Sequence, residues 1–199
     1  MQLYFDKWFI ENYECNSTLN TIAYVNPTRT LSKNQVAKCF DMSTLPVKGC
    51  VPVGCEYKPY NGGMKFINGD TIFARITPCL ENGKAAFMNI LEDDEVAFGS
   101  TEYIVLSPKE KIPPSFFYFL ARNTAFITYA VAHMNGSSGR QRVSGSDIAN
   151  FPIKMPSHSD LQLFDNYASK VLDEMKYIAL EIAKLKELQT ILTATISGG

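Results

Sequence analysis

The sequence predicts an α+β protein in which a globular head, with a mixed, curved β-sheet and short helices, is followed by a long C-terminal helix. Short strand-like runs outnumber helical runs over residues 1–157, and no regular alternation of strand, helix and strand is visible there. Residues 158–199 instead carry one uninterrupted heptad pattern. We therefore expect a head over residues 1–157 and a helical arm over residues 158–199.

The composition is that of a folded chain, with 46% hydrophobic and 12% aromatic residues among 199, which suits one domain plus the arm. No run of about 18 apolar residues occurs, so we expect no transmembrane helix. The opening segment also lacks the apolar core of a signal peptide. The five cysteines include no C-x-x-C pair and indicate reduced thiols in the cytoplasm. The net charge of −1 neither favours nor excludes a nucleic-acid partner.

The head divides into short elements along the chain. The expected helical segments are residues 1–13, one that opens at Pro113 and Pro114, residues 125–134 and a turn at Ser146–Asp147. The expected strands are residues 21–25, 36–42, 71–76, 84–89, 96–98, 102–106 and 151–155. Residues 47–63 contain glycine or proline at many positions, and we expect an irregular loop there with a functional role.

The arm is predicted by a heptad seam that is apolar at every a and d position except Gln189. A helix from about Asp160 to Ile196 would be roughly 55 Å long at about 1.5 Å per residue. We interpret Ser159 with Gln162 as a capping box at its start. This length favours a coiled-coil arm that reaches away from the head, and the alternative is a long helix docked on its own domain. The seam residues are Phe164, Ala168, Val171, Met175, Ile178, Ile182, Leu185, Gln189, Leu192 and Ile196.

Catalytic and cofactor motifs are missing from the sequence. There is no G-x-x-x-x-G-K-[ST] phosphate-binding loop and no G-x-G-x-x-G after a strand. With two histidines and no partnered nucleophile, acid–base and covalent catalysis have little to work with. The same two histidines make a structural zinc site improbable. We therefore expect a binding protein with no cofactor, no metal and no catalytic residues.

Polar residues that suit DNA are concentrated in a glycine loop over residues 136–142. Arginine forks and a flexible backbone suit phosphate oxygens, and a glutamine suits an adenine edge. Arg75 and Lys84, on either side of the turn at Asn82, are expected to continue the same surface. The alternative is an exposed connector with solvated charges. The loop supplies Ser137, Ser138, Arg140, Gln141 and Arg142.

These segments, in this order, resemble one known family. Residues 69–84 (GDTIFARITPCLENGK), residues 136–143 (GSSGRQRV) and the heptad helix are similar to the specificity subunits of type I restriction–modification enzymes. Residues 151–156 (FPIKMP) resemble the strand that leads into that family's spacer helix, and residues 185–192 (LKELQTIL) resemble its closing segment. The opening residues 5–10 (FDKWFI) look like the end of its central spacer.

The resemblance implies a target recognition domain that reads one half of a bipartite DNA site, while methylation and ATP-driven restriction belong to other subunits. The long helix would set the distance between half-sites and hold the DNA adenine methyltransferase subunit, with the restriction subunit joining indirectly. The residues implied to contact double-stranded DNA are Arg75, Asn82, Lys84, Ser137, Ser138, Arg140, Gln141 and Arg142. Within residues 47–63, the side chains expected to read bases are those of Lys58, Tyr60 and Asn61.

The chain departs from that family's pattern in length. Typical members carry two recognition domains and two spacers, and this chain has one of each. Because a lone seam leaves apolar surface exposed, we expect two copies to pair through it, or a missing half to do so. The alternative function is an interaction or anti-restriction module that occupies the methyltransferase without reading DNA. The expected interface residues are Phe164, Val171, Met175, Ile178, Ile182, Leu185 and Leu192.

Overall fold

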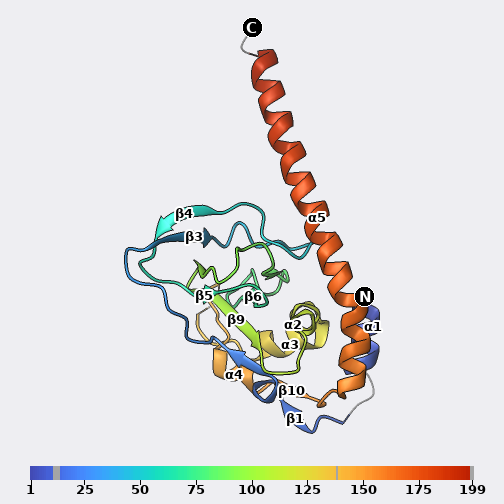
Figure 1. Cartoon of the computed structure of the whole chain (residues 1–199). Coiled ribbons are helices and arrows are strands. Elements are labelled where there is room, and N and C mark those ends of the chain that lie inside the picture. Colours follow the sequence, from blue (N-terminus) through green and yellow to red (C-terminus); the bar gives the residue numbers. More distant parts are fainter. Residues whose placement is uncertain (11–13, 138, 198–199) are drawn as a thin grey trace.

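The computed structural model describes residues 1–10, 14–137 and 139–197, which form a head and one long helix (Figure 1). Within these residues, helices cover one face of an antiparallel sheet, and a mixed sheet covers its other face. The predicted α+β class with a long C-terminal helix is therefore confirmed. The prediction of a single mixed sheet is wrong, because the strands separate into two larger sheets and a short pair formed by β1 (Ser17–Thr18) and β10 (Pro152–Ile153).

The antiparallel sheet lies in the middle of the head, with the strand order β2-β9-β6-β7. Successive side chains of a strand point to opposite faces. Accordingly, Phe73 on the central strand belongs to the core beneath the helices, and Ile72 belongs to the core beneath the second sheet. An apolar strand with both faces buried needs cover on both sides, which is why one sheet is not enough. The strands are β2 (Ala23–Val25), β9 (Tyr103–Pro108), β6 (Thr71–Ala74) and β7 (Ala85–Phe87).

The mixed sheet has the strand order β4-β3-β8-β5, with β3 parallel to β8 and the other pairs antiparallel. Its strand β4 lies inside residues 47–63, where an irregular loop was expected, so that prediction is wrong in part. Pairing with β3 satisfies backbone groups of β4 within an otherwise irregular segment. The strands are β3 (Val36–Phe40), β4 (Glu56–Pro59), β5 (Lys65–Phe66) and β8 (Ala97–Gly99).

The helices of the head lie where the sequence predicts them. Proline at the first turn opens α2, and the Asn123 side chain caps α3 by accepting from the Phe126 amide at 3.0 Å. A complete capping box of Ser144 and Asp147 starts α4. The elements are α1 (Gln2–Phe5), the wider turn η1 (Asp6–Ile10), the short turn η2 (Leu19–Thr21), α2 (Pro114–Ala121), α3 (Thr124–Ala132) and α4 (Gly145–Ala149). The predicted opening helix over residues 1–13 ends at residue 10 in the described part, and residues 11–13 lie outside it.

An aromatic cluster fastens the long helix to the head. Phe164, fully buried, has its ring centroid 5.6 Å from that of Phe5, 5.4 Å from that of Phe9 and 5.4 Å from that of Phe119. Edge-to-face contacts at such distances add to the free energy of burying the rings themselves. The cluster therefore joins the opening segment, α2 and the base of the long helix.

The long helix α5 (His158–Ser197) combines the two alternatives that its sequence left open. Its base is docked, with Leu161, Phe164, Ala168 and Leu172 buried in the main core. Beyond the head it projects alone, and Ile182 and the seam residues after it are exposed (Figure 1). Phe164 was expected at a partner interface and instead packs in the chain's own core.

The start of α5 also differs from the prediction. Ser157, not Ser159, caps it: the Ser157 hydroxyl accepts from the Asp160 amide at 3.1 Å, and it bonds to the Asp160 carboxylate at 2.6 Å. A serine lies at both positions, so the pattern could not distinguish them. In the described part of the chain, no helix is long and apolar enough to cross a membrane.

We predict that Phe164→Ala lowers the free energy of unfolding by about 3–5 kcal/mol, because it removes a ring that the rings of Phe5, Trp8, Phe9 and Phe119 surround. Urea unfolding followed by circular dichroism measures this change. Leu180→Ala is the matched control, since Leu180 lies on the same helix with half of its surface exposed, and it should change stability by less than about 0.5 kcal/mol. Equal effects of the two variants would show that the base of α5 is not docked.

Candidate nucleic-acid interface

The described residues of the predicted glycine loop, 135–137 and 139–142, belong to a hairpin, called the arginine hairpin below. Its ends are closed by two backbone hydrogen bonds, from the Asn135 amide to the Arg142 carbonyl at 3.0 Å and in return at 2.9 Å. A Cβ on Gly136, whose φ is +125°, would lie 3.1 Å from the Arg140 carbonyl oxygen, so this position requires glycine. Ser137 is exposed at the tip, and Ser138 lies outside the described residues.

The arginine hairpin is attached to the extension of β6. The Thr77 amide donates to the Gln141 carbonyl at 3.1 Å, and the Val143 amide donates to the Arg75 carbonyl at 3.0 Å. Ile76 and Arg142 form an isolated antiparallel bridge between these two bonds. The structure therefore brings Arg75 beside the hairpin, as the sequence predicted, although the two segments are about 60 residues apart.

Arg142 is held in an ion pair by Glu102. Its Nε lies 2.9 Å from both carboxylate oxygens, and its Nη2 lies 2.6 Å from Oε1. The hydrogen bond to Glu102 raises the pKa of the Arg142 guanidinium. The third nitrogen, Nη1, donates to the Arg140 carbonyl at 2.8 Å. In this conformation Arg142 carries a compensated charge, which differs from the open phosphate ligand that the sequence suggested.

Two other arginines of this surface have no such partner. Arg140 is exposed, and within the described residues its guanidinium makes no hydrogen bond or ion pair. Arg75 is half-buried, and its Nε is enclosed without a hydrogen-bond acceptor. The hydroxyl of Thr77, two residues along the same strand extension, is likewise buried without a partner. A phosphate oxygen can reach the exposed Arg140 guanidinium and the terminal nitrogens of Arg75, whereas the Arg75 Nε and the Thr77 hydroxyl are enclosed by the protein.

Asn82 and Lys84 lie at the adjoining turn and differ in availability. Asn82 is exposed, whereas the Lys84 ammonium donates to the Met42 carbonyl at 2.8 Å. The backbone joins this turn to β6, because the Ala74 amide donates to the Lys84 carbonyl at 3.0 Å. The backbone of Lys84 therefore lies near that of Arg75, but the Lys84 ammonium group is directed to the turn at Met42.

The residues predicted to read bases lie on or after β4, in the mixed sheet. Lys58 pairs with Asp41 at 2.9 Å and with Glu56 at 2.8 Å, and these hydrogen bonds raise its pKa, that to Glu56 most. Tyr60 packs edge-on against Phe98, with its hydroxyl 3.4 Å from the Gly63 carbonyl. Asn61 is exposed and free to present its amide, apart from a marginal 3.5 Å contact to its own neighbour's carbonyl.

Sequence reasoning missed Arg122, which anchors the start of residues 47–63. It follows α2, and its guanidinium donates to the carbonyls of Gly49 at 2.7 Å, Gly83 at 2.8 Å and Ala85 at 2.9 Å. It also donates to the carbonyls of Pro46, at 3.1 Å, and Val47. An arginine that follows a helix is usually exposed. Only the structure shows that residues 46–49 and residues 83–85 come together around the Arg122 guanidinium.

The seam on α5 is the second candidate surface. Ile178, Ile182, Leu185 and Leu192 are exposed, while Val171 and Met175 are half-buried against the head. A groove of about 270 Å³ lies where α5 leaves the head, and it is lined by Lys48, Gly49, Val53, Met175, Ile178, Ala179, Ile182, Ala183 and Lys186. At the base, a second groove of about 430 Å³ is lined by Met1, Tyr4, Trp8, Leu163 and Tyr167. Apolar surface on this scale is typical of interaction sites.

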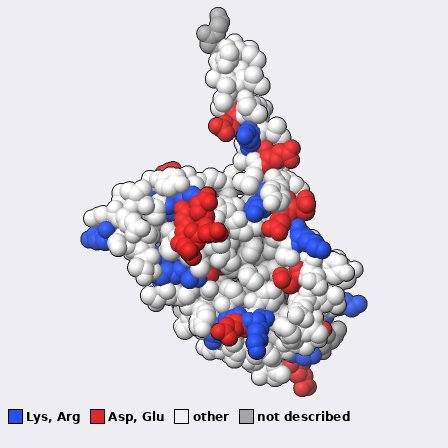
Figure 2. Space-filling view, viewed as in Figure 1, with Lys and Arg blue, Asp and Glu red and all other residues white. Residues whose placement is uncertain are grey.

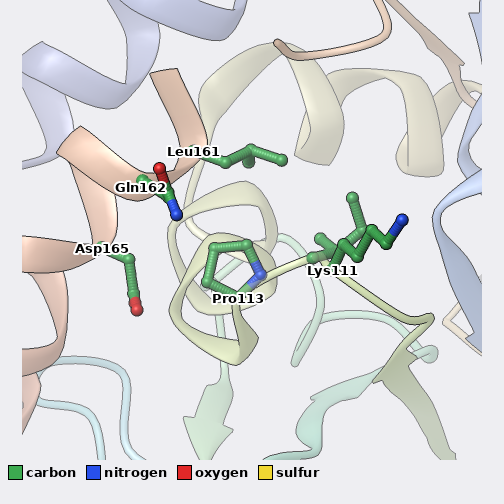
Figure 3. Close-up of a pocket in the computed structure, with 6 residues that line it drawn as sticks. Lys111, Pro113, Leu161, Gln162 and Asp165 are labelled. Carbon is green, nitrogen blue, oxygen red and sulfur yellow. The ribbon is translucent and has the colours of Figure 1, made fainter. Parts of the chain in front are cut away.

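One further hollow and the charge on one face of the head were compared with the predicted DNA-binding residues. A shallow hollow of about 270 Å³ at the start of α5 is lined by Lys111, Ile112, Pro113, Leu161, Gln162 and Asp165, but the amine of Lys111 points away from the carboxylate of Asp165 (Figure 3). None of the predicted DNA-binding residues lines it. Figure 2 shows positive and negative side chains interspersed over one face of the head, so charge on that face does not mark a DNA track.

Comparison with known protein families identifies the family to which this chain belongs. The family described as the type I restriction modification DNA specificity domain matches residues 14–192, which is most of the chain. The chain belongs to this family. Its resemblance to specificity subunits, predicted from the glycine loop and the heptad helix, is therefore confirmed.

Curated relatives of this chain agree with the family assignment. The chain is 31% identical over 146 residues to the type I restriction enzyme EcoAI specificity subunit of Escherichia coli, which covers 70% of this chain and 25% of that protein. It is 26% identical over 159 residues to the EcoEI specificity subunit of Escherichia coli, covering 72% and 25% respectively. The chain thus matches about a quarter of the length of these relatives.

Two solved structures share the fold. A chain from a structural study of complex assembly and conformational transition of the type I R-M system has a TM-score of 0.58 at 10% identity, covering 96% of this chain and 48% of that one. The crystal structure of the HsdS subunit from Thermoanaerobacter tengcongensis has a TM-score of 0.57 at 10% identity, covering 94% and 47%. The chain therefore spans about half the length of each of these solved chains.

We predict that Arg122→Gln lowers the free energy of unfolding by about 2 kcal/mol or more, since a glutamine cannot reach five carbonyls and leaves several buried acceptors unpaired. Chemical denaturation measures this loss. Arg140→Gln makes the same change of side chain at an exposed position and should leave the unfolding midpoint unchanged. A wild-type midpoint for Arg122→Gln would contradict the anchoring role.

Proposed function

We propose that the chain recognises DNA sequence as the non-catalytic specificity component of a type I restriction–modification complex, and that its head reads one half of a bipartite site. The observation that carries the proposal is the family match over residues 14–192, which spans both the head and most of α5. The sequence lacks the motifs for nucleotide binding and nucleophilic catalysis. This lack fits a subunit that leaves the chemistry to other subunits.

The arginine hairpin is the proposed phosphate contact. Arg140 and Arg75 carry charges that no carboxylate in the described chain compensates. Such contacts fix the position of a protein on a duplex and carry no sequence information. Base readout would fall to polar side chains such as the exposed Asn61, after β4, and the half-buried Gln141 of the hairpin.

The arm has the proposed role of spacing and assembly. A helix of 40 residues is about 60 Å long, and its base is fixed in the core, so its direction relative to the head is constrained. We propose that the exposed seam pairs with a second helix, from another copy of the chain or from a second half of a longer specificity subunit. The methyltransferase subunit would bind the same arm, and Gln189 would set the register of the pair.

No observation on the described residues favours the alternative of an interaction module without DNA binding. Arg140 and Arg75 are more useful to a DNA-binding protein than to a chain that only occupies a methyltransferase. In either case the arm would be used alike, so the head decides between them.

We predict that the full chain binds a 40-base-pair duplex of mixed sequence with an affinity that falls about 100-fold between about 50 and 200 mM salt, as expected for roughly four phosphate contacts. Fluorescence anisotropy at a series of salt concentrations gives the slope. A neutral dye-labelled polymer, measured in the same heparin-free buffer, serves as the control for non-specific adsorption of the label to the protein. Affinity that is absent or independent of salt would favour the alternative module.

We predict that the chain alone is a dimer at micromolar concentration, because the exposed seam would otherwise remain in water. Leu185→Glu and Leu192→Glu should give monomers in sedimentation velocity, since each places a charge in the seam. Leu180→Glu is the matched control on the same helix, outside the seam, and should remain dimeric. A monomeric wild-type chain would contradict the homodimer and leave pairing with a second half as the proposal.

A further inference from the structure

Glu102 lies between two arginines of the proposed DNA-binding surface and pairs with only one of them. The Arg75 amide donates to the Glu102 carbonyl at 2.9 Å, which continues the pairing of β6 with β9 by one residue. The Glu102 side chain nevertheless bonds to Arg142, at 2.6 and 2.9 Å, and leaves Arg75 Nε without an acceptor. The carboxylate thus neutralises the charge of Arg142 and leaves that of Arg75 unpaired.

Each of the three guanidinium nitrogens of Arg142 donates to an oxygen of the protein. Nε and Nη2 bond to Glu102, and Nη1 bonds to the Arg140 carbonyl. Together with the bridge of Arg142 to Ile76, these bonds connect the β6–β9 edge to the backbone of residue 140. A phosphate could bind Arg142 only in competition with a bidentate carboxylate, which is among the stronger pairings available to an arginine.

The same bonds restrain Arg140. Its carbonyl is held by Arg142, and its amide donates to the Ser137 carbonyl at 3.0 Å. Both backbone groups of Arg140 are therefore fixed while its side chain extends into solvent. A side chain on a fixed backbone loses less conformational entropy when it binds than one on a mobile loop.

We propose that Glu102 and Arg142 are positioning residues that hold the arginine hairpin in its DNA-binding conformation, and that Arg140 and Arg75 supply the charges that meet phosphate. The inference rests on the proposed DNA binding and makes a finer assignment within it. It removes Arg142 from the direct contacts and adds Glu102, a negatively charged residue that a search for DNA-binding residues by charge would reject.

The sign of one substitution tests the assignment. Glu102→Gln removes a negative charge and frees Arg142. If Arg142 contacted phosphate itself, this variant would bind a duplex more tightly and with a steeper salt slope. The positioning role predicts the opposite, a loss of affinity of about three- to tenfold at fixed salt, because the hairpin loses its restraint. Anisotropy with a 40-base-pair mixed-sequence duplex and the full chain measures both quantities.

Two further variants separate positioning from contact. Arg140→Ala should lower the slope of log affinity against log salt by about 0.9, the value for one phosphate. Arg142→Lys keeps a positive charge but loses the fork that joins Glu102 to the Arg140 carbonyl, so it should weaken binding as much as Glu102→Gln does. Affinity close to wild type for Arg142→Lys would overturn the positioning role, since a lysine retains a point-charge contact.

The controls address charge and folding. Glu110→Gln removes one exposed negative charge away from the hairpin and should not lower affinity. Hydrogen exchange should show faster exchange at the Asn135 and Arg142 amides of Glu102→Gln, with the Val105 amide in the sheet unchanged. Tighter binding by Glu102→Gln overturns this inference while leaving DNA binding intact. Loss of binding by the wild-type chain would instead contradict the proposed function, and this inference with it.

Discussion

The burial of Phe164 is the constraint on which the rest of this structure depends. The ring is fully buried among Phe5 and Phe9 of the opening segment and Phe119 of α2. Aromatic rings pack with directional preferences, so this cluster restricts both the position and the angle at which α5 leaves the head. A long helix whose base could pivot would transmit no geometry. With its base fixed in the core, α5 can hold a second element at a defined distance from the head.

Polar interactions restrict the positions of the loops, as the aromatic cluster restricts the position of α5. Arg29 bonds to both carboxylate oxygens of Asp70, and the Ile67 amide donates to that carboxylate at 2.9 Å, which holds the turn before β6. Burial raises the pKa of Asp70, while the Ile67 amide and the Arg29 charge act in the opposite direction. Arg122 binds the carbonyls of two loops in the same way. Segments with few apolar contacts are thereby kept in one conformation, and a surface that reads DNA needs that order.

Charge on the proposed DNA-binding surface is partly neutralised within the protein. Lys58 and Arg142 are in ion pairs and Lys84 is bonded to a backbone carbonyl, whereas Arg140 is unpaired in the described chain. A positively charged residue type is therefore a weak guide to phosphate contact. Whether a charge is available depends on which carboxylates and carbonyls lie within reach, and those come from distant parts of the sequence. The near-neutral net charge of the chain is consistent with a few uncompensated charges.

The sequence alone determined the α+β class, the places of most strands and helices, the long helix and the family, because heptad spacing, turn residues and an ordered set of motifs are local patterns. From the sequence we also expected Arg75 to continue the surface of the hairpin, next to the turn at Asn82. Only the tertiary structure decided that the head contains two larger sheets, that the base of α5 is buried in the core and that Glu102 forms an ion pair with Arg142. Those outcomes depend on contacts between residues tens of positions apart, and no spacing rule along a single chain encodes which distant oxygen a guanidinium will reach.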